Sequence, residues 1–313
     1  MKPYTIAIAG STQHTVICAK ALQESPEFEV LWTLTPDPKP IGRDQSVTKN
    51  PLHQWSEEHA IPSILVNKKI DERIKNDIEE ISTQHARPDF LLVVDFGYII
   101  PDWLLALPAI APLNIHPSLL PKWRGSSPGQ FVLLYGEKNS AVTLMEMNAG
   151  LDTGPIIHQE KFAVNSAWTQ TEYYAESFNL ISKILVGKIV EFAKTGKKNE
   201  QPQVLPVTIA RRLKKEDGFI SWTELQSCTT TNNQLLAETQ RSTNQSLAQV
   251  IEQASRAFSP WPVLWTVIPT AKGEKRMQIL KCHIVAGEKI ELDQVKIEGQ
   301  EKSAWVQVKN QIL

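Results

Sequence analysis

An amide, an imidazole and a carboxylate are the side chains in this sequence whose types and spacing could do chemistry. Asn114 and His116 stand in LNIHPSLLP, directly after an apolar run, and Asp152 stands further on in GLDTG. On a strand, residues 114 and 116 point to the same face. The amide can stabilise a carbonyl oxygen that gains charge, the imidazole can manage protons, and the carboxylate can hold the imidazole or relay the proton. This set predicts transfer of a carbonyl-containing group.

Each of these residues also has an ordinary structural interpretation. A lone histidine at a strand end is often only hydrogen bonded, and an aspartate between glycines often marks a turn. Against this, Pro117 and Pro121 stiffen the loop after His116, at the end of a predicted strand where open α/β sheets bind ligands. The other histidines have no partner at metal-ligand spacing, so we expect surface or packing roles for His14, His53, His59, His85, His158 and His283.

The first two hundred residues alternate predicted strands with predicted helices. We expect strands at Tyr4–Ala9, Glu29–Thr35, Ser63–Val66, Asp89–Asp95, Pro112–His116, Ala141–Met147 and Gly154–Phe162. We expect helices over residues 14–24, 51–59, 70–84, 101–107, 128–135 and 169–195, with a long loop over residues 36–51. The run DFLLVVD is of the kind that is buried on both faces of a parallel sheet. The pattern predicts a doubly wound, mostly parallel, Rossmann-like α/β sheet.

The composition changes after residue 196 and indicates a second domain. We expect a first, catalytic domain over residues 1–196, a polar linker over residues 197–206, and a smaller β-barrel-like (OB-like) domain over residues 207–313. A length of 313 residues also favours two domains. The stretch from Leu225 to Phe258 is polar and helix-favouring.

Several classes of protein are disfavoured by composition and motif. A net charge of −1 gives no overall attraction to nucleic acid, so such a partner would need a local basic patch. Three distant cysteines without a CxxC pair disfavour a disulfide framework or a zinc site. Gly10 is followed by Ser-Thr-Gln-His rather than by GxGxxG, which disfavours a dinucleotide. The first apolar run is too short for a signal peptide, and we expect a cytoplasmic protein.

The segments NIHPSLLPKWRGSSPGQ and MNAGLDTGPI resemble the folate-dependent formyltransferases, whose pattern is N-x-H, then SLLP, then a distant aspartate. VVDFGYIIPDWLLALP, RRLKKEDGFISW and RAFSPWPVLW extend this resemblance, in order, along nearly the whole chain. They narrow it to the members that act on methionyl-tRNA. The resemblance implies a monomer that transfers formyl from 10-formyltetrahydrofolate to the α-amino group of methionyl initiator tRNA, without a metal.

The same resemblance implies roles for individual residues. Asn114, His116 and Asp152 fall on the family's catalytic triplet. The implied folate contacts are Ser118, Leu119, Leu120, Pro121, Val94, Asp95, Phe96 and Gly97, with residues 145–151 lining the same pocket. The implied tRNA contacts are Lys39, Arg43 and Lys49 in the long loop. Asp44, Gln45 and Ser46 make that loop less basic than is usual, which predicts a shallower dependence of tRNA affinity on salt.

Other interpretations stay open at this point. The same triplet serves glycinamide ribonucleotide transformylase, which lacks a second domain, and sugar-nucleotide N-formyltransferases, which need a nucleotide pocket. A related hydrolase would release formate to water. A catalytically silent tRNA-binding protein would have no physical reason to keep all three side chains. The second domain, with a longer region between residues 222 and 256, is expected to be a reduced barrel.

Overall fold

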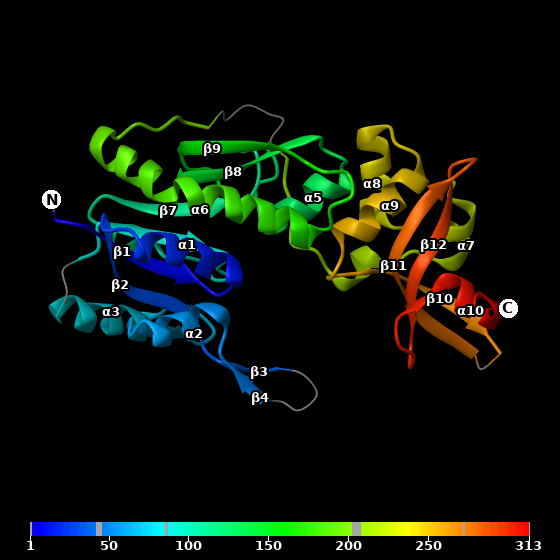
Figure 1. Ribbon diagram of the computed structural model, residues 1–313, viewed down its shortest axis with the longest axis horizontal. Coiled ribbons are helices and arrows are strands. Elements are labelled where there is room, and N and C mark those ends of the chain that lie inside the picture. The colour runs from blue at the N-terminus through cyan, green and yellow to red at the C-terminus, as the bar shows by residue number, and fades with distance from the viewer. Residues whose placement is uncertain (1, 42–45, 85–86, 202–207, 272, 313) are drawn as a thin grey trace. The chain divides into compact units, whose positions relative to one another are not determined.

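The computed structural model describes residues 2–41, 46–84, 87–201, 208–271 and 273–312 (Figure 1). The chain forms two compact units, and each is built from several segments. The first unit comprises Met1–Arg124, Ala141–Lys161 and Ala175–Val207. The second unit comprises Gly125–Ser140, Phe162–Tyr174 and Thr208–Leu313.

A seven-stranded sheet in the order β5-β2-β1-β6-β7-β8-β9 organises the first part of the chain. Its strands are β1 (Tyr4–Gly10), β2 (Phe28–Pro36), β5 (Ser63–Val66), β6 (Phe90–Val94), β7 (Ala111–His116), β8 (Asn139–Glu146) and β9 (Ile156–Ala163). The strands from β5 to β7 pair in parallel, whereas β8 is antiparallel to β7. The accompanying helices are α1 (Gln13–Gln23), α2 (Pro51–Glu58), α3 (Glu72–Gln84), α4 (Asp102–Leu105), α5 (Pro128–Leu134) and α6 (Gln170–Thr195). The predicted doubly wound, mostly parallel sheet is therefore confirmed.

The central strands β1 and β6 explain why this sheet is stable. Every residue of β6 is buried, and in β1 only Tyr4 is partly exposed. Such strands have an apolar side chain for each face, as a sheet covered by helices on both sides requires. The N-termini of α1 and α2 are capped by the side chains of Thr12 and Asn50, which accept hydrogen bonds from backbone N–H groups.

Three parallel strands end at one level of the sheet, and this level positions the polar residues that follow them. Gly10 at the end of β1 pairs with Val94 at the end of β6, and Val93 pairs with Asn114 in β7. A side chain at position 10 would place its Cβ 2.4 Å from the Val94 carbonyl oxygen, so only glycine fits this close approach. The carboxyl ends of parallel strands are where α/β sheets bind ligands.

The segment predicted as a long loop over residues 36–51 contains a small hairpin instead. Strands β3 (Lys39–Ile41) and β4 (Ser46–Thr48) pair antiparallel (Figure 1). Residues 42–45 lie outside the described residues. The hairpin escaped sequence prediction because each of its strands is only three residues long and contains a Pro, Lys or Ser that weakens a strand pattern.

The second unit contains a four-stranded antiparallel sheet, so the predicted smaller domain with β-strands is confirmed. Its strands are β10 (Leu264–Thr270), β11 (Gly273–Val285), β12 (Lys289–Ile297) and β13 (Ser303–Ala304), in that order. The polar region before them forms α7 (Trp222–Ser227), α8 (Gln234–Thr243) and α9 (Leu247–Ala257), and α10 (Trp305–Val308) follows. Ser221, Asn233 and Ser246 cap α7, α8 and α9, which explains why Ser- and Asn-rich sequence forms three helices.

Part of the segment predicted as an interdomain linker is bonded to the first unit. Asn199 exchanges two backbone hydrogen bonds with Ile156, of 2.7 and 2.8 Å. Gln201 is only 2% exposed. The domain limits proposed from the sequence, 1–196 and 207–313, stay a prediction.

Candidate active site

Asn114 and His116 lie at the carboxyl end of β7, on the same face, as the spacing predicted. His116 is only 5% exposed. One ring nitrogen, Nε2, lies 2.9 Å from the backbone oxygen of Trp123. Since a carbonyl only accepts hydrogen bonds, Nε2 must carry a hydrogen and Nδ1 is the nitrogen whose protonation can change.

Asp152 approaches this nitrogen from the loop between β8 and β9. Its Oδ2 lies 3.6 Å from Nδ1 of His116, and its side chain is 13% exposed. This separation is too long for a hydrogen bond but close enough for an ion pair when the imidazole is protonated. The structure therefore brings two members of the predicted triplet together, with Asn114 two residues earlier on the same strand.

Two buried side chains, Gln201 and Arg124, form a clamp on the loop that carries Asp152. The side-chain amide of Gln201 donates to the backbone oxygens of Asp152, at 3.1 Å, and Gly154, at 2.7 Å. The side-chain oxygen of Gln201 accepts from Nε and Nη2 of Arg124, at 3.2 and 2.7 Å. Burial lowers the pKa of Arg124, and the nearby charge of Asp152 opposes that effect. Asp152 itself has a left-handed backbone, with φ 51°, that this clamp keeps in place.

The loop over residues 118–121 is held by its own hydrogen bonds. The hydroxyl of Ser118 donates to the backbone oxygen of Lys122 at 2.7 Å, and Thr143 donates to the backbone oxygen of Ser118 at 2.7 Å. Ser118 and Leu120 are buried, whereas Leu119 and Pro121 are partly exposed. The exposed part that a ligand could touch is therefore apolar.

The segment Val94–Gly97 follows β6, which is the neighbour of β7 in the sheet. The Val94 side chain is fully buried, Asp95 and Phe96 are partly exposed, and Gly97 is exposed. A Cβ built on Gly97 meets nothing within 4 Å, so the backbone there is open to a planar ligand.

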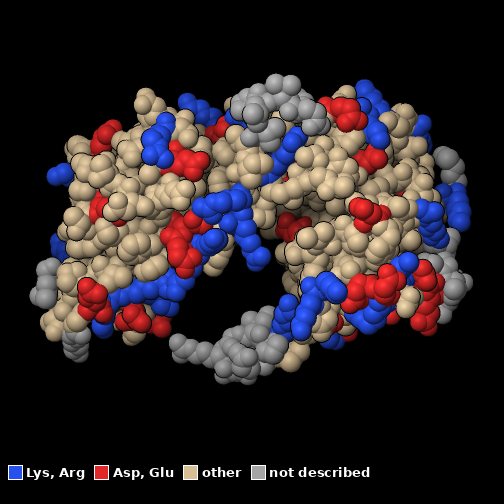
Figure 2. Space-filling model, turned by 180° about the vertical axis from the view of Figure 1, so that it is seen from behind, with Lys and Arg blue, Asp and Glu red and all other residues tan. Residues whose placement is uncertain are grey.

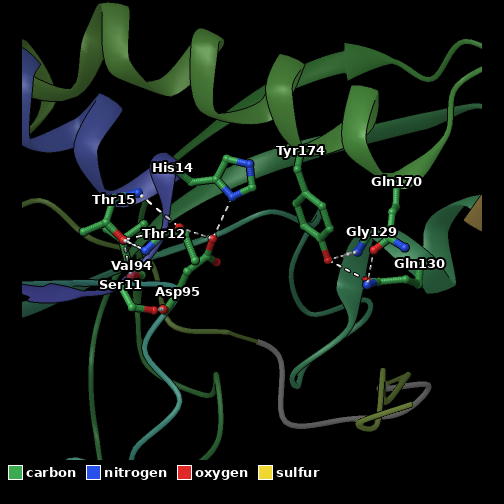
Figure 3. A network of polar contacts seen from close by, with 10 residues as sticks. All are labelled: Ser11, Thr12, His14, Thr15, Val94, Asp95, Gly129, Gln130, Gln170 and Tyr174. Carbon is green, nitrogen blue, oxygen red and sulfur yellow. Dashed lines mark hydrogen bonds and ion pairs between the residues drawn. The ribbon is translucent and has the colours of Figure 1, made fainter. Parts of the chain in front are cut away.

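Asp95 lies in a polar network that the sequence did not predict (Figure 3). Its Oδ2 is 2.7 Å from Nδ1 of His14 and accepts a hydrogen bond from the Thr12 hydroxyl at 3.0 Å. The expectation that His14 has only a surface or packing role overlooked this contact. Asp95 directly follows β6, and His14 lies four positions after the end of β1, which was the available signal. The pairing of β1 with β6 joins these two positions, which are 81 residues apart in the sequence.

The predicted tRNA contacts lie on or beside the hairpin, except that Arg43 is outside the described residues. Lys39 and Lys49 are exposed. Lys49 pairs with Glu57 of α2, at 2.7 Å from Oε2, so part of its charge is already neutralised. On the face seen in Figure 2, Lys and Arg side chains lie next to Asp and Glu side chains in most places.

A search of the described residues finds no group of three or more His, Cys, Asp or Glu side chains that could hold a metal ion. Within the same ranges, no helix is long and apolar enough to cross a membrane. The cysteines in this part of the chain, Cys18, Cys228 and Cys282, are buried and free.

The formyl transferase family model matches residues 4–189 of this sequence, which include Asn114, His116 and Asp152. The chain belongs to the formyl transferase family. Within it, the chain is similar to methionyl-tRNA formyltransferases. The Magnetococcus marinus enzyme is 30% identical over 271 residues, which cover 85% of this chain and 77% of the relative. The Legionella pneumophila enzyme is 29% identical over 267 residues, covering 85% and 76%.

Solved structures show the same fold. Methionyl-tRNA formyltransferase from Clostridium thermocellum has a TM-score of 0.55 at 19% identity, over 94% of this chain and 98% of that one. A sugar 3N-formyl transferase, crystallised with dTDP and 5-N-formyl-THF, has a TM-score of 0.57 at 17% identity, over 90% and 87%. At these identities the likeness concerns the fold alone.

Proposed function

We propose that this enzyme transfers the formyl group of 10-formyltetrahydrofolate to the α-amino group of methionyl initiator tRNA. The observation that carries the proposal is the approach of Asp152 to Nδ1 of His116 at the end of β7, with Asn114 on the same face. The chain's membership of the formyl transferase family and its likeness to methionyl-tRNA formyltransferases along 85% of its length support the choice of reaction.

Each of the three side chains has a distinct task in this reaction. When the amine attacks the formyl carbon, the carbonyl oxygen gains negative charge, and the Asn114 amide donates a hydrogen bond to it. One such donor is typically worth about 3 kcal/mol, or roughly a hundredfold in rate. The nitrogen of the acceptor must lose a proton and N10 of the folate must gain one. His116, through Nδ1, and Asp152 are placed to carry that proton.

The formyl donor fits between two backbone segments of the first unit. Leu119 and Pro121 offer partly exposed apolar surface, and the exposed Gly97 leaves room for a planar ring against the backbone. The proposed folate contacts are therefore residues 94–97 and 118–121, with the folate as a co-substrate that supplies the formyl group. No step in this scheme requires a metal.

The methionyl-tRNA is proposed to bind with its acceptor stem against the first unit and to contact the second unit as well. Lys39 and Lys49 on the hairpin, and Arg43 between its strands, are the proposed phosphate contacts of the first unit. Residues 207–313 are proposed as the domain that contacts tRNA. A cytoplasmic monomer is the expected form of the enzyme.

One assay tests this assignment. The purified chain receives 10-formyltetrahydrofolate with methionyl initiator tRNA, methionyl elongator tRNA or glycinamide ribonucleotide in parallel reactions. Formylation of the initiator tRNA in clear preference to the other two supports the proposal. Preferred formylation of glycinamide ribonucleotide, or formate release without any acceptor, would refute it.

Two variants test the assigned residues. His116→Ala and Asp152→Ala should fold normally and lose roughly a hundredfold or more in kcat, since each removes a group that moves the proton. Normal turnover by either folded variant would reject its catalytic assignment.

A further inference from the structure

A second carboxylate–imidazole pair lies at the carboxyl edge of the sheet, next to the strand that carries Asn114 and His116. Asp95 follows β6, and His14 belongs to the first turn of α1, which follows β1. Nδ1 of His14 lies 2.7 Å from Oδ2 of Asp95, and both side chains are more than a quarter exposed. The His14 ring stacks on Phe178 of α6, with centroids 4.5 Å apart and planes at 4°. The pair is therefore rigid but reachable from solvent (Figure 3).

The hydrogen bonds to this carboxylate converge on one of its two oxygens. His14 and the Thr12 hydroxyl both bond to Oδ2, and the Ser11 hydroxyl donates to the backbone oxygen of Asp95 at 3.2 Å. Among the described residues, none bonds to Oδ1. Asp95 also has a left-handed backbone, with φ 48°. Such strain costs on the order of 1 kcal/mol and is concentrated at functional sites. The arrangement leaves Oδ1 as the carboxylate oxygen that can bind a ligand.

The sheet register places Asp95 beside the end of the strand that carries Asn114 and His116. Val93 pairs with Asn114, so Asp95, which follows β6, and His116, the last residue of β7, each stand two residues beyond that pair. Neighbouring strands are about 4.8 Å apart. The strand order β1-β6-β7-β8 puts Asp95 on one side of β7, whereas Asp152 reaches the site from beyond β8 on the other side. A carboxylate therefore flanks the end of β7 on each side.

The proton balance of formyl transfer requires a second acceptor. An α-amino group has a pKa of roughly 7.7–8.0 in solution, so much of the acceptor arrives as an ammonium ion at neutral pH. An ammonium and an N-formyl amine give a formamide, a free amine and one proton. His116 and Asp152 serve the proton that passes from the attacking nitrogen to N10. The proton that the ammonium loses before attack needs another base.

We infer that Oδ1 of Asp95 binds the α-ammonium group of the acceptor and that the His14–Asp95 pair accepts its proton. This inference rests on the proposed function. One N–H bond of the ammonium breaks, its electron pair stays on nitrogen, and the net charge of the pair changes from −1 to 0 until water removes the proton. Besides His116 at the end of the neighbouring strand, a further titratable group near the carboxylate is Cys18, one turn along α1. Burial, and to a lesser degree the charge of Asp95, raise the pKa of Cys18, so its thiol stays protonated throughout.

The test is the pH dependence of Asp95→Asn. Asparagine tolerates a left-handed backbone, so this change removes the charge and keeps the local conformation. We expect kcat/KM for methionyl-tRNA to fall roughly twentyfold at pH 6.5. The deficit should shrink by about tenfold per pH unit as free amine replaces ammonium, and nearly vanish above the pKa of the amine.

Two further variants complete the design. His14→Gln should show the same trend with a smaller deficit, and it carries the test if Asp95→Asn does not fold. The control is Asp89→Asn, at the opposite end of β6, where the carboxylate accepts hydrogen bonds from the backbone and hydroxyl of Thr5. Its pH profile should match the wild type.

The outcomes separate this inference from the function on which it rests. A wild type that formylates methionyl-tRNA, together with Asp95 and His14 variants whose deficit is absent or equal at every pH, would overturn the inference alone. A wild type that transfers no formyl group to methionyl-tRNA would overturn the proposed function as well.

Discussion

The clamp formed by Gln201 gives a prediction whose size can be worked out from the structure. The change is Gln201→Ala, at a side chain that is 2% exposed. It removes donors to the backbone oxygens of Asp152 and Gly154 and the acceptor for the guanidinium of Arg124, itself 5% exposed. These contacts tie the loop that carries Asp152 to Arg124, which follows Trp123, the residue whose backbone oxygen bonds to His116.

The expected loss of stability follows from the kinds of hydrogen bond removed. Two neutral bonds contribute about 1 kcal/mol each, and a bond to a charged group contributes about 1.5–3 kcal/mol. The vacated space is polar, so water that enters it restores part of this sum. We expect the free energy of unfolding to fall by about 2–4 kcal/mol. Since the Asp152 loop loses its tie, kcat should fall by roughly tenfold to a hundredfold.

The assay is urea unfolding followed by tryptophan fluorescence, with steady-state kinetics on the same preparations. Glu200→Ala is the matched control, because Glu200 is the exposed neighbour of Gln201 on the same segment. Gln201→Glu separates the two halves of the clamp, since it keeps an acceptor for Arg124 but loses both donors to the loop; it should lose activity as well. Unfolding midpoints and kcat values that match Glu200→Ala would refute the reasoning.

Three other predictions address the loop, the second unit and the thiols. Gly154→Ala should destabilise the protein by about 1–3 kcal/mol in urea unfolding, because its Cβ would lie 1.8 Å from the Glu146 backbone oxygen; an unchanged midpoint would contradict it. The pKa of Asp217 is lowered because hydrogen bonds, chiefly from Arg211, outweigh the burial that raises it. The stabilisation that ionised Asp217 contributes is therefore present above the unfolded-state pKa of about 3.9 and is lost as pH falls through the lower folded-state pKa. In Asp217→Asn, the free energy of unfolding should depend less steeply on pH in the acid range, as measured by circular dichroism. Burial raises the pKa of Cys282 to about 12 and raises that of Cys18 further, so neither thiol should react with a disulfide reagent at pH 8 until denaturant is added.

The sequence was informative where a local pattern determines the geometry. Alternation along β7 places Asn114 and His116 on one face whatever the rest of the fold does. The unbroken apolar run of β6 likewise predicts a strand buried on both faces. Both statements depend only on residues a few positions apart, which is the range over which side-chain periodicity acts.

The features that the sequence missed depend on contacts between distant segments. His14 and Asp95 meet only because β1 and β6 are neighbours in the sheet. Gln201 stands in a polar stretch with Lys, Asn and Pro, a composition typical of a linker, and nothing local indicates that its side chain is buried. In each case a polar residue acquires its role from a partner that periodicity does not identify.

The orientation of the His116 ring shows how a local prediction is refined by such a partner. The spacing of Asn114 and His116 predicts the face but does not tell which ring nitrogen serves the reaction. The backbone oxygen of Trp123 lies next to Nε2, so Nδ1 is the ring nitrogen that faces Asp152. The 3.6 Å between Nδ1 and Oδ2 of Asp152 is longer than a hydrogen bond, so a proton on Nδ1 is not committed to the carboxylate. In the proposed mechanism that proton remains available to the substrate. A short hydrogen bond between Nδ1 and Oδ2 would hold the proton between the two side chains. His116 would then be a poorer proton donor to the substrate.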